Sequence, residues 1–201
     1  MNSERWRFVS NFSRSQLYFP MDTRDDAALV VDSLTGDRRA FGTLVDRYYS
    51  PVYNVALRML RSREDAEDVA QTVFVKAYEK LDTYKARHQF FSWVYRIAVN
   101  EAINRARKQS RAEEYESGET VVVAATQATD VSEAELAGIV GDAIMQMSID
   151  HRMVIVLRHY HDFSYQEIAS VLEIPEKMVK SRLFTARRRL REILEHKGVT
   201  G

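Results

Sequence analysis

A Ser-capped helix, a short turn and a basic second helix follow one another between residues 163 and 194, and this stretch constrains the fold most. Ser164 and Glu167 have the Ser-x-x-Glu spacing of a capping box, in which hydroxyl and carboxylate each accept a backbone N–H. Glu173-Ile174-Pro175 should end the first helix, because proline lacks an N–H and disfavours helical backbone in the residue before it. The pattern predicts a helix-turn-helix, whose second helix can lie in a DNA major groove.

The second helix of this unit has an apolar side and a basic side. Between residues 176 and 191 it carries seven Lys or Arg and one acidic residue. Such a helix gains affinity for nucleic acid by releasing counterions from phosphates. The alternative is the solvated face of an ordinary core helix, but the capping box, the turn and the regular apolar stripe favour DNA binding. That stripe consists of Val179, Leu183, Ala186, Leu190 and Ile193.

Composition points to an all-α protein. The 201 residues include only three prolines and seven glycines, and no stretch is rich in strand formers. The chain has no cysteine, which excludes disulfides and thiolate metal sites and fits a reducing cytoplasm. Apolar runs are too short to span a membrane, and residues 1–20 lack the apolar core of a secretion signal. We therefore expect a cytoplasmic protein without membrane insertion of its own.

The helical periodicity divides the chain into two small helical domains, residues 21–108 and 133–197. Residues 109–132 have no helical stripe and carry five acidic residues and one basic, which is typical of a flexible linker. Residues 1–20 are expected to form a loosely ordered extension.

Several helix boundaries follow from local signals. Asp37 and Ser62 are candidate N-caps, and Ser132 begins a second Ser-x-x-Glu box. Pro51 either kinks a helix or starts a new one. The last helix of the first domain should run from about Ser92 to Lys108, and a helix from about 150 to 160 should lead into the helix-turn-helix.

Two helices of the first domain differ in surface character. One carries an acidic face away from its apolar stripe, which should repel DNA and meet a protein; its members are Glu64, Asp65, Glu67, Asp68 and Gln71. The other carries a polar stripe that can reach bases and phosphates, with Arg96, Asn100, Asn104, Arg107 and Lys108. Aromatic residues crowd its start, and they either stack on unpaired bases or form core: Phe90, Phe91, Trp93 and Tyr95.

Three segments together resemble the extracytoplasmic-function (group four) sigma factors of bacterial RNA polymerase. "AEDVAQTVFVKAYEKLD" is similar to the family's polymerase-binding helix, and "FFSWVYRIAVNEAINRARK" to its minus-ten segment. "FSYQEIASVLEIPEKMVKSRLFTARRRLRE" is similar to its minus-thirty-five helix-turn-helix. The resemblance runs from about residue 22 to 195 in family order.

The resemblance implies a fold and a function. The domains would be sigma region 2, a helical bundle, and sigma region 4, with an acidic linker that threads toward the polymerase active site. The chain would bind core RNA polymerase, direct promoter-specific initiation and aid strand opening, without a cofactor and without catalysing a reaction. Family members are commonly held inactive by an anti-sigma factor.

The resemblance also assigns residues. Asp65, Glu67, Asp68 and Gln71 would grip polymerase. The loop Tyr84–Phe91, which includes Lys85 and Phe90, would hold a base flipped out of the minus-ten strand. Trp93 and the polar stripe from Arg96 to Lys108 would contact the minus-ten DNA beside it. Minus-thirty-five contacts would come from Lys177, Lys180, Ser181, Arg182, Phe184, Thr185, Arg187 and Arg188.

The sequence departs from the family pattern at five positions. Thr72 replaces an acidic residue, Ala86 and Glu173 replace glycines, Asn104 replaces an aspartate and Thr185 replaces a basic residue. A non-glycine residue at positive φ is uncommon, so the turn at Glu173 is expected to be strained or reshaped.

Two other functions stay open. A stand-alone helix-turn-helix repressor would bind duplex DNA without polymerase, at two-fold symmetric half-sites. A metal enzyme could use the carboxylates between Glu64 and Asp68, although no histidine follows a glutamate by three residues as helical di-iron sites require. His159 and His161 point to different sides of a helix and are expected to be ordinary histidines.

Overall fold

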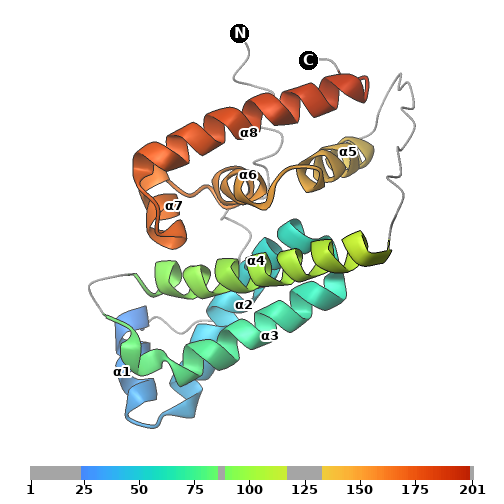
Figure 1. The fold of residues 1–201 in the computed structure, drawn as a ribbon. Helices are drawn as coiled ribbons and strands as arrows, with labels where there is room; N and C mark the ends of the chain where they lie inside the picture. The colour runs from blue at the N-terminus through green and yellow to red at the C-terminus, as the bar shows by residue number, and fades with distance from the viewer. Residues whose placement is uncertain (1–23, 86–88, 117–132, 200–201) are drawn as a thin grey trace. The chain divides into compact units, whose positions relative to one another are not determined.

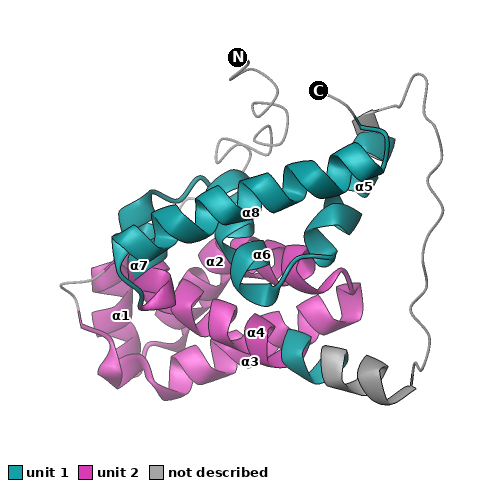
Figure 2. Ribbon diagram, turned by 45° about the horizontal axis from the view of Figure 1, so that its top comes forward, with its two compact units in different colours: residues 1–11, 106–169, 174–201 teal, residues 12–105, 170–173 magenta. Residues whose placement is uncertain are grey.

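The computed structural model describes residues 24–85, 89–116 and 133–199, with side chains omitted at 110–116 and 133–134, and all of its regular elements are helical (Figure 1). Helices α1–α4 make up the N-terminal part and α5–α8 the C-terminal part. The chain divides into two compact units, residues 12–105 with 170–173, and residues 1–11 with 106–169 and 174–201 (Figure 2). The predicted all-α class with two helical domains is confirmed.

Local capping starts each of the first three helices. α1 (Asp26–Leu34) is capped by Asp25, whose carboxylate accepts the Ala28 N–H at 2.7 Å. α2 (Arg38–Leu60) is capped by Asp37, and Gly36 before it has a φ of +104°, which glycine adopts without strain. α3 (Arg63–Glu79) is capped by Ser62, as its sequence predicted.

Pro51 does not divide α2. The helix is continuous from Arg38 to Leu60, and Pro51 lies buried within it. Of the two alternatives, a new helix after Pro51 is therefore wrong. α2 packs against both α1 and α3, which makes it the centre of the bundle. The largest side chains buried there are Leu29, Leu44, Val52, Val55, Met59, Val73, Phe90 and Tyr95.

α4 (Phe90–Glu116) begins two residues earlier than predicted and ends eight residues later than Lys108. Residues 109–116 were expected to start the flexible linker, and that expectation is wrong for them. They contain neither glycine nor proline and are rich in Arg, Ala and Glu, so extending an existing helix is favourable. The rest of the predicted linker, 117–132, lies outside the described residues, as do residues 1–23 and Ser132.

The C-terminal part contains α5 (Glu133–Met145), α6 (Ile149–Ile155), α7 (Tyr165–Leu172) and α8 (Glu176–His196). The predicted helix from 150 to 160 changes to a π-helical turn at Val156–Tyr160. α8 packs on α5 and α6, and its buried residues are the five of the predicted apolar stripe.

A buried arginine joins α5 to α6. Arg152 is only 8% exposed, and its guanidinium donates to the backbone carbonyls of Met145 at 2.6 Å and Met147 at 3.3 Å. The last carbonyls of a helix lack intrahelical partners, so a cation at this end satisfies them. This contact fixes the turn between the two helices.

Candidate functional site

The capping box of the helix-turn-helix forms as predicted. Ser164 Oγ accepts the Glu167 N–H at 3.1 Å, and the Glu167 carboxylate accepts the Ser164 N–H at 2.7 Å. Glu173 has a φ of +53°, in the left-handed region where glycine is favoured. The turn therefore lies where the sequence predicted it, and its non-glycine residue Glu173 adopts the strained left-handed conformation.

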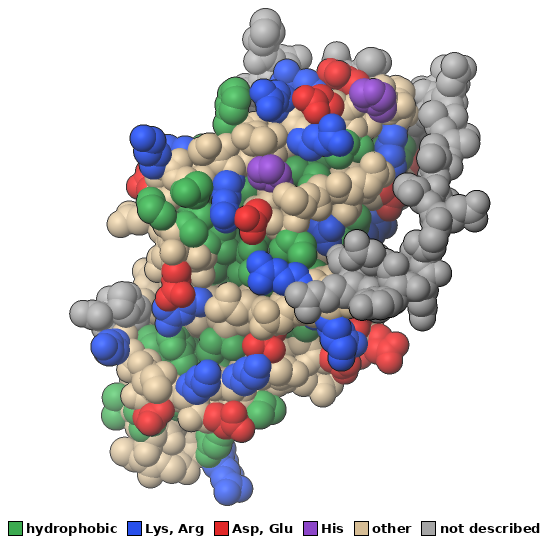
Figure 3. Space-filling model, viewed as in Figure 1, with side chains coloured by type: hydrophobic (Ala, Val, Ile, Leu, Met, Phe, Trp, Pro, Cys, Tyr) green, Lys and Arg blue, Asp and Glu red, His purple; other side chains and the backbone are tan. Residues whose placement is uncertain are grey.

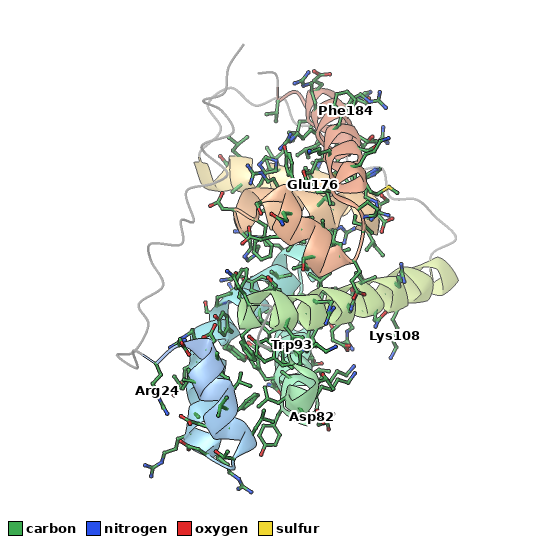
Figure 4. The ribbon with its side chains drawn as sticks, turned by 90° about the vertical axis from the view of Figure 1, so that its left-hand side faces the viewer. Arg24, Asp82, Trp93, Lys108, Glu176 and Phe184 are labelled. Atoms are coloured by element: carbon green, nitrogen blue, oxygen red, sulfur yellow. The ribbon has the colours of Figure 1, made fainter. Side chains whose placement is uncertain are left out.

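α8 presents a mixed polar and apolar face. Lys177, Lys180, Ser181 and Arg188 are exposed, and Phe184 is 70% exposed, although it is a large apolar side chain (Figure 4). Lys180 pairs with Glu176 one turn earlier at 2.7 Å, and this hydrogen bond raises the pKa of the Lys180 ammonium. In Figure 3 Lys and Arg side chains are spread over the whole face shown, with acidic side chains among them, and several of them lie in the upper part of the view.

Two of the predicted minus-thirty-five contacts, Arg182 and Arg187, have partners within the domain. Arg182 is 26% exposed and pairs with Asp150 of α6 at 3.0 Å. Arg187 donates from Nε to His159 Nε2 at 3.3 Å. Burial and the charges of Arg187 and Arg158 lower the pKa of His159 from 6.5 to about 4. His159 is thus an acceptor for an arginine, in agreement with an ordinary structural histidine.

The predicted polar stripe of α4 lies on its exposed side. Asn100, Asn104, Arg107 and Lys108 are exposed, and Arg96 is half-buried (Figure 4). The opposite row of the helix, Val94, Ala98, Ala102 and Ala106, is buried at 4% exposure or less. α4 therefore holds its polar side chains outward on a rigid helix.

Of the two alternatives for the aromatic residues at the start of α4, the structure shows core for Phe90, Trp93 and Tyr95. Phe90 is 1% exposed, Trp93 7% and Tyr95 1%, so their faces are covered by protein. Tyr84, which is half-buried, packs edge-on against Phe90 and Trp93 with centroids 5.6 and 5.7 Å apart. These rings support the start of α4 and the end of the loop before it. Within that loop, Lys85 is exposed, and residues 86–88 lie outside the described part.

Tyr84 also lies close to the negative charges of α1. Burial, followed by the charges of Asp26 and Asp25, raises its pKa. Tyr48 donates its hydroxyl to Asp26, and its pKa is raised as well. Both phenols therefore stay protonated at neutral pH, and Tyr48 is a hydrogen-bond donor to Asp26.

The acidic face of α3 is only partly as predicted. Glu64, Glu67, Asp68 and Gln71 are exposed, and Thr72 is exposed next to them. The Asp65 side chain is 14% exposed and is bound by Arg105 of α4, so it does not belong to the outward face. The sequence gives no local signal for Arg105, because its partner lies 40 residues away. Within the described ranges, no three His, Asp or Glu side chains lie close enough together to hold a metal ion.

Comparisons with known proteins agree with this architecture. The sigma-70 region 2 family matches residues 44–112, and the sigma-70 region 4 family matches residues 137–190. The ECF RNA polymerase sigma-E factor of Haemophilus influenzae is 36% identical over 183 residues, covering 86% of this chain and 94% of that protein. The sigma-E factor of Escherichia coli is 37% identical over 173 residues, covering 81% and 90%.

Solved structures give the same result. CnrH, solved in complex with the cytosolic domain of CnrY, superposes with a TM-score of 0.65 at 26% identity, covering 85% of this chain and 97% of CnrH. RpoE from Bartonella quintana, solved with the anti-sigma factor NepR, superposes with a TM-score of 0.58 at 24% identity and shares the fold, covering 82% of this chain and 98% of that one.

The two domains in order define a class of protein that lends promoter recognition to a polymerase. The chain belongs to the ECF sigma factors of the sigma-70 family. Its function is promoter recognition in transcription initiation, and a stand-alone repressor is not favoured. Among the described helices, none combines the length and the apolar character that crossing a membrane requires.

Proposed function

We propose that three separate helical faces of this sigma factor bind three different targets. The outward acids of α3 bind core RNA polymerase, the polar stripe of α4 contacts the minus-ten region, and α8 contacts the minus-thirty-five element. The observation that carries this proposal is the contrast in surface chemistry. α3 exposes carboxylates in its first two turns, whereas the stripe of α4 exposes amides and cations, and α8 exposes more cations than carboxylates. Carboxylates are repelled by phosphates, so the acidic face is suited to a protein partner.

The polymerase-binding face consists of Glu67, Asp68 and Gln71, with Glu64 at its edge. All four are exposed, and they project from one rigid helix whose opposite side is buried against α2. A positively charged helical surface of polymerase is the partner that this charge pattern fits. Thr72 in place of an acid removes one charge from the face and should lower polymerase affinity.

For minus-ten DNA, we propose that the loop from Tyr84 holds an unpaired base and that α4 contacts the strands. Phe90 and Trp93 act indirectly, because they are buried and support the loop ends. Base edges are reached from Asn100 and Asn104, and phosphates from Arg107 and Lys108, all of them exposed. The rigid helix supports their alignment along one side.

For minus-thirty-five DNA, Lys180, Ser181 and Phe184 are proposed to face the bases in the major groove. An exposed phenylalanine in the middle of a recognition helix suits the methyl group of a thymine. Lys177 and Arg188 are placed on phosphates, and Arg182 and Arg187 can join them from positions that their internal partners fix. Thr185 carries no charge and should alter sequence preference.

The proposed domain limits are 21–108 for region 2, 133–197 for region 4 and 109–132 for the connection, whose first eight residues extend α4. Residues 1–20 remain an extension without an assigned role. We further propose that an anti-sigma factor regulates the chain in the cytoplasm, since two similar folds were solved with such partners or with a cytosolic domain. The chain itself catalyses no reaction.

The test begins with the purified chain, core polymerase and a genome-wide map of transcript starts. Run-off transcription from a mapped promoter should require both the chain and the core enzyme. The chain alone should bind the same duplex weakly, which a gel shift measures. Tight, symmetric binding of the duplex without polymerase, together with no promoter-dependent transcript, would identify a repressor instead.

One variant tests the polymerase-binding face. Asp68→Lys reverses a charge that is 59% exposed, so it should reduce core binding strongly and leave helicity unchanged. Asp46→Lys, the same charge reversal at an exposed acid of α2 without an assigned role, is the matched control. Unchanged affinity for core polymerase in Asp68→Lys would refute the assignment of this face.

A further inference from the structure

One guanidinium joins the acidic helix to the DNA-facing helix. Arg105 of α4 donates from Nε to Asp65 Oδ1 at 2.6 Å and from Nη2 to the same oxygen. Its Nη2 also lies 3.6 Å from Asp68 Oδ2, one turn further along α3. Asp65 is 14% exposed and Asp68 59%, so the inner carboxylate is bound firmly and the outer one lies at the rim of the contact.

A second ion pair of reversed polarity joins the same two helices. Lys76 of α3 donates to Glu101 of α4 at 2.7 Å, and Glu101 is 19% exposed. Here the base is on α3 and the acid on α4. Residues 101 and 105 are one helical turn apart on the same side of α4. Sliding α4 by one turn would therefore bring Glu101 opposite Asp65, where the two carboxylates would repel. The pairs stabilise one register of the two helices only.

Asp65 lies in the first turn of α3, directly after its N-cap Ser62. It is the third residue of α3, and its backbone N–H is bound by Ser62 Oγ at 3.1 Å. Its carboxylate accepts two hydrogen bonds from Arg105, and charge-assisted bonds of this kind are the stronger ones.

We propose that Arg105 and Asp65 are positioning residues, which fix the DNA-facing stripe of α4 relative to the polymerase-binding face of α3. This inference rests on the proposed function of both faces. With polymerase bound to Asp68 and its neighbours, the pair determines where Asn100, Asn104 and Arg107 meet the promoter. Its loss should therefore impair strand opening, while polymerase binding is retained.

Because Arg105 lies beside Asp68, the proposal also predicts the direction in which the affinity for core polymerase changes when Arg105 is replaced. Arg105 and polymerase would attract the same outer carboxylate, at 3.6 Å in the free protein. Neutralising Arg105 removes this internal competitor. Core polymerase should then bind Arg105→Gln equally well or slightly more tightly, whereas a direct polymerase ligand would lose affinity when neutralised.

The experiment uses the full chain with core polymerase and a promoter mapped for it. The variants are Arg105→Gln, Asp65→Asn and the double variant, with Asp46→Asn as the matched control. Core affinity is measured by titrating a fluorescently labelled chain, and strand opening by permanganate reactivity of unpaired thymines. The opening assay is done on the duplex promoter and on the same fragment with a preformed bubble.

Core affinity should stay within about twofold in all variants, and opening of the duplex should fall by about five- to tenfold in each single variant. The double variant should be no worse than either, because both changes remove the same contact. The preformed bubble should largely restore open complexes. Arg105→Lys keeps the charge but not the planar fork, so it should lie between the wild-type chain and Arg105→Gln. If Arg105→Gln loses helicity, Arg105→Lys replaces it as the test variant.

Two results would overturn the proposal. If Asp65→Asn weakens core binding by well over twofold while Arg105→Gln has no effect, Asp65 is a polymerase ligand. If opening of the duplex is unchanged in Arg105→Gln, Arg105→Lys and Asp65→Asn, the pair does not position α4. Failure of the polymerase-binding face itself would appear differently, as unchanged core affinity in Asp68→Lys.

Discussion

The pairing of His159 with Arg187 predicts that the C-terminal domain loses stability under mildly acidic conditions. His159 is half-buried and accepts a hydrogen bond from Arg187, so its folded form is neutral. Burial and the two neighbouring arginines, Arg187 and Arg158, lower its pKa from 6.5 to about 4. Protonation would remove the acceptor and place a third positive charge beside two others.

The direction of the change in stability with pH follows from the number of protons that the folded and the unfolded chain bind. Between pH 6.5 and about 4 the unfolded chain binds a proton at His159 that the folded chain does not. The contribution to stability is therefore complete above pH 6.5 and is lost as the pH falls through this window. The full difference in pKa corresponds to at most about 3 kcal/mol, and solvent screening of a half-buried group reduces it to about 1–2 kcal/mol.

Urea unfolding followed by far-ultraviolet circular dichroism, at about pH 7.5 and about pH 5, measures this effect. His159→Gln keeps an acceptor for Arg187 but does not titrate, so its stability should fall by about 1–2 kcal/mol less than that of the wild-type chain. His196→Gln, at an exposed histidine of α8, is the control for titration elsewhere. An equal loss of stability in the wild-type chain and His159→Gln would refute the reasoning.

Three further predictions concern residues with clear structural roles. Phe90→Ala should destabilise the N-terminal bundle by about 3–5 kcal/mol in thermal unfolding, because it opens a cavity; a base-stacking ring would leave stability unchanged. Arg152→Met should cost about 2–3 kcal/mol by removing the donor to the carbonyls of Met145, the last residue of α5, and of Met147, in the turn after it. The chain has two tryptophans, so in a Trp6→Phe background the fluorescence comes from Trp93 in the N-terminal domain. Circular dichroism should then report the loss of stability, whereas unfolding followed by Trp93 fluorescence should be unchanged. Lys180→Ala should weaken minus-thirty-five binding by about 1–3 kcal/mol and relax base preference there, as competition with mutated promoter fragments measures.

Much of the fold could be predicted because it depends on local chemistry. The caps at Asp37, Ser62 and Ser164 require only a side-chain oxygen near the first free amides, and all three form. The buried stripe of α8 follows from helical periodicity in the same way. Helix ends were harder, since α4 continues to Glu116 where composition alone suggested a linker.

The errors at the candidate sites concern side chains whose environment depends on distant segments. Phe90 and Trp93 can be core or surface by spacing alone, and packing with Tyr84 and Tyr48 decides for core. Asp65 lies in an acidic run, and only the folded position of Arg105 removes it from the outward face. Hydrophobic pattern determines which side of a helix is buried, but not which polar neighbour a partly buried carboxylate will meet.

This distinction matters for how charges near a binding face are interpreted. An acid that is fully exposed is available to an external partner, and its intramolecular pairs contribute little. An acid that is mostly buried must be paired internally, because an unpaired buried charge is costly. Asp65 and Asp68 lie one turn apart on α3 but differ in this respect. The Asp65 side chain is 14% exposed and mostly buried, whereas the Asp68 side chain is 59% exposed. The same sequence motif can therefore supply both a polymerase ligand and the contact that orients the neighbouring DNA-binding helix.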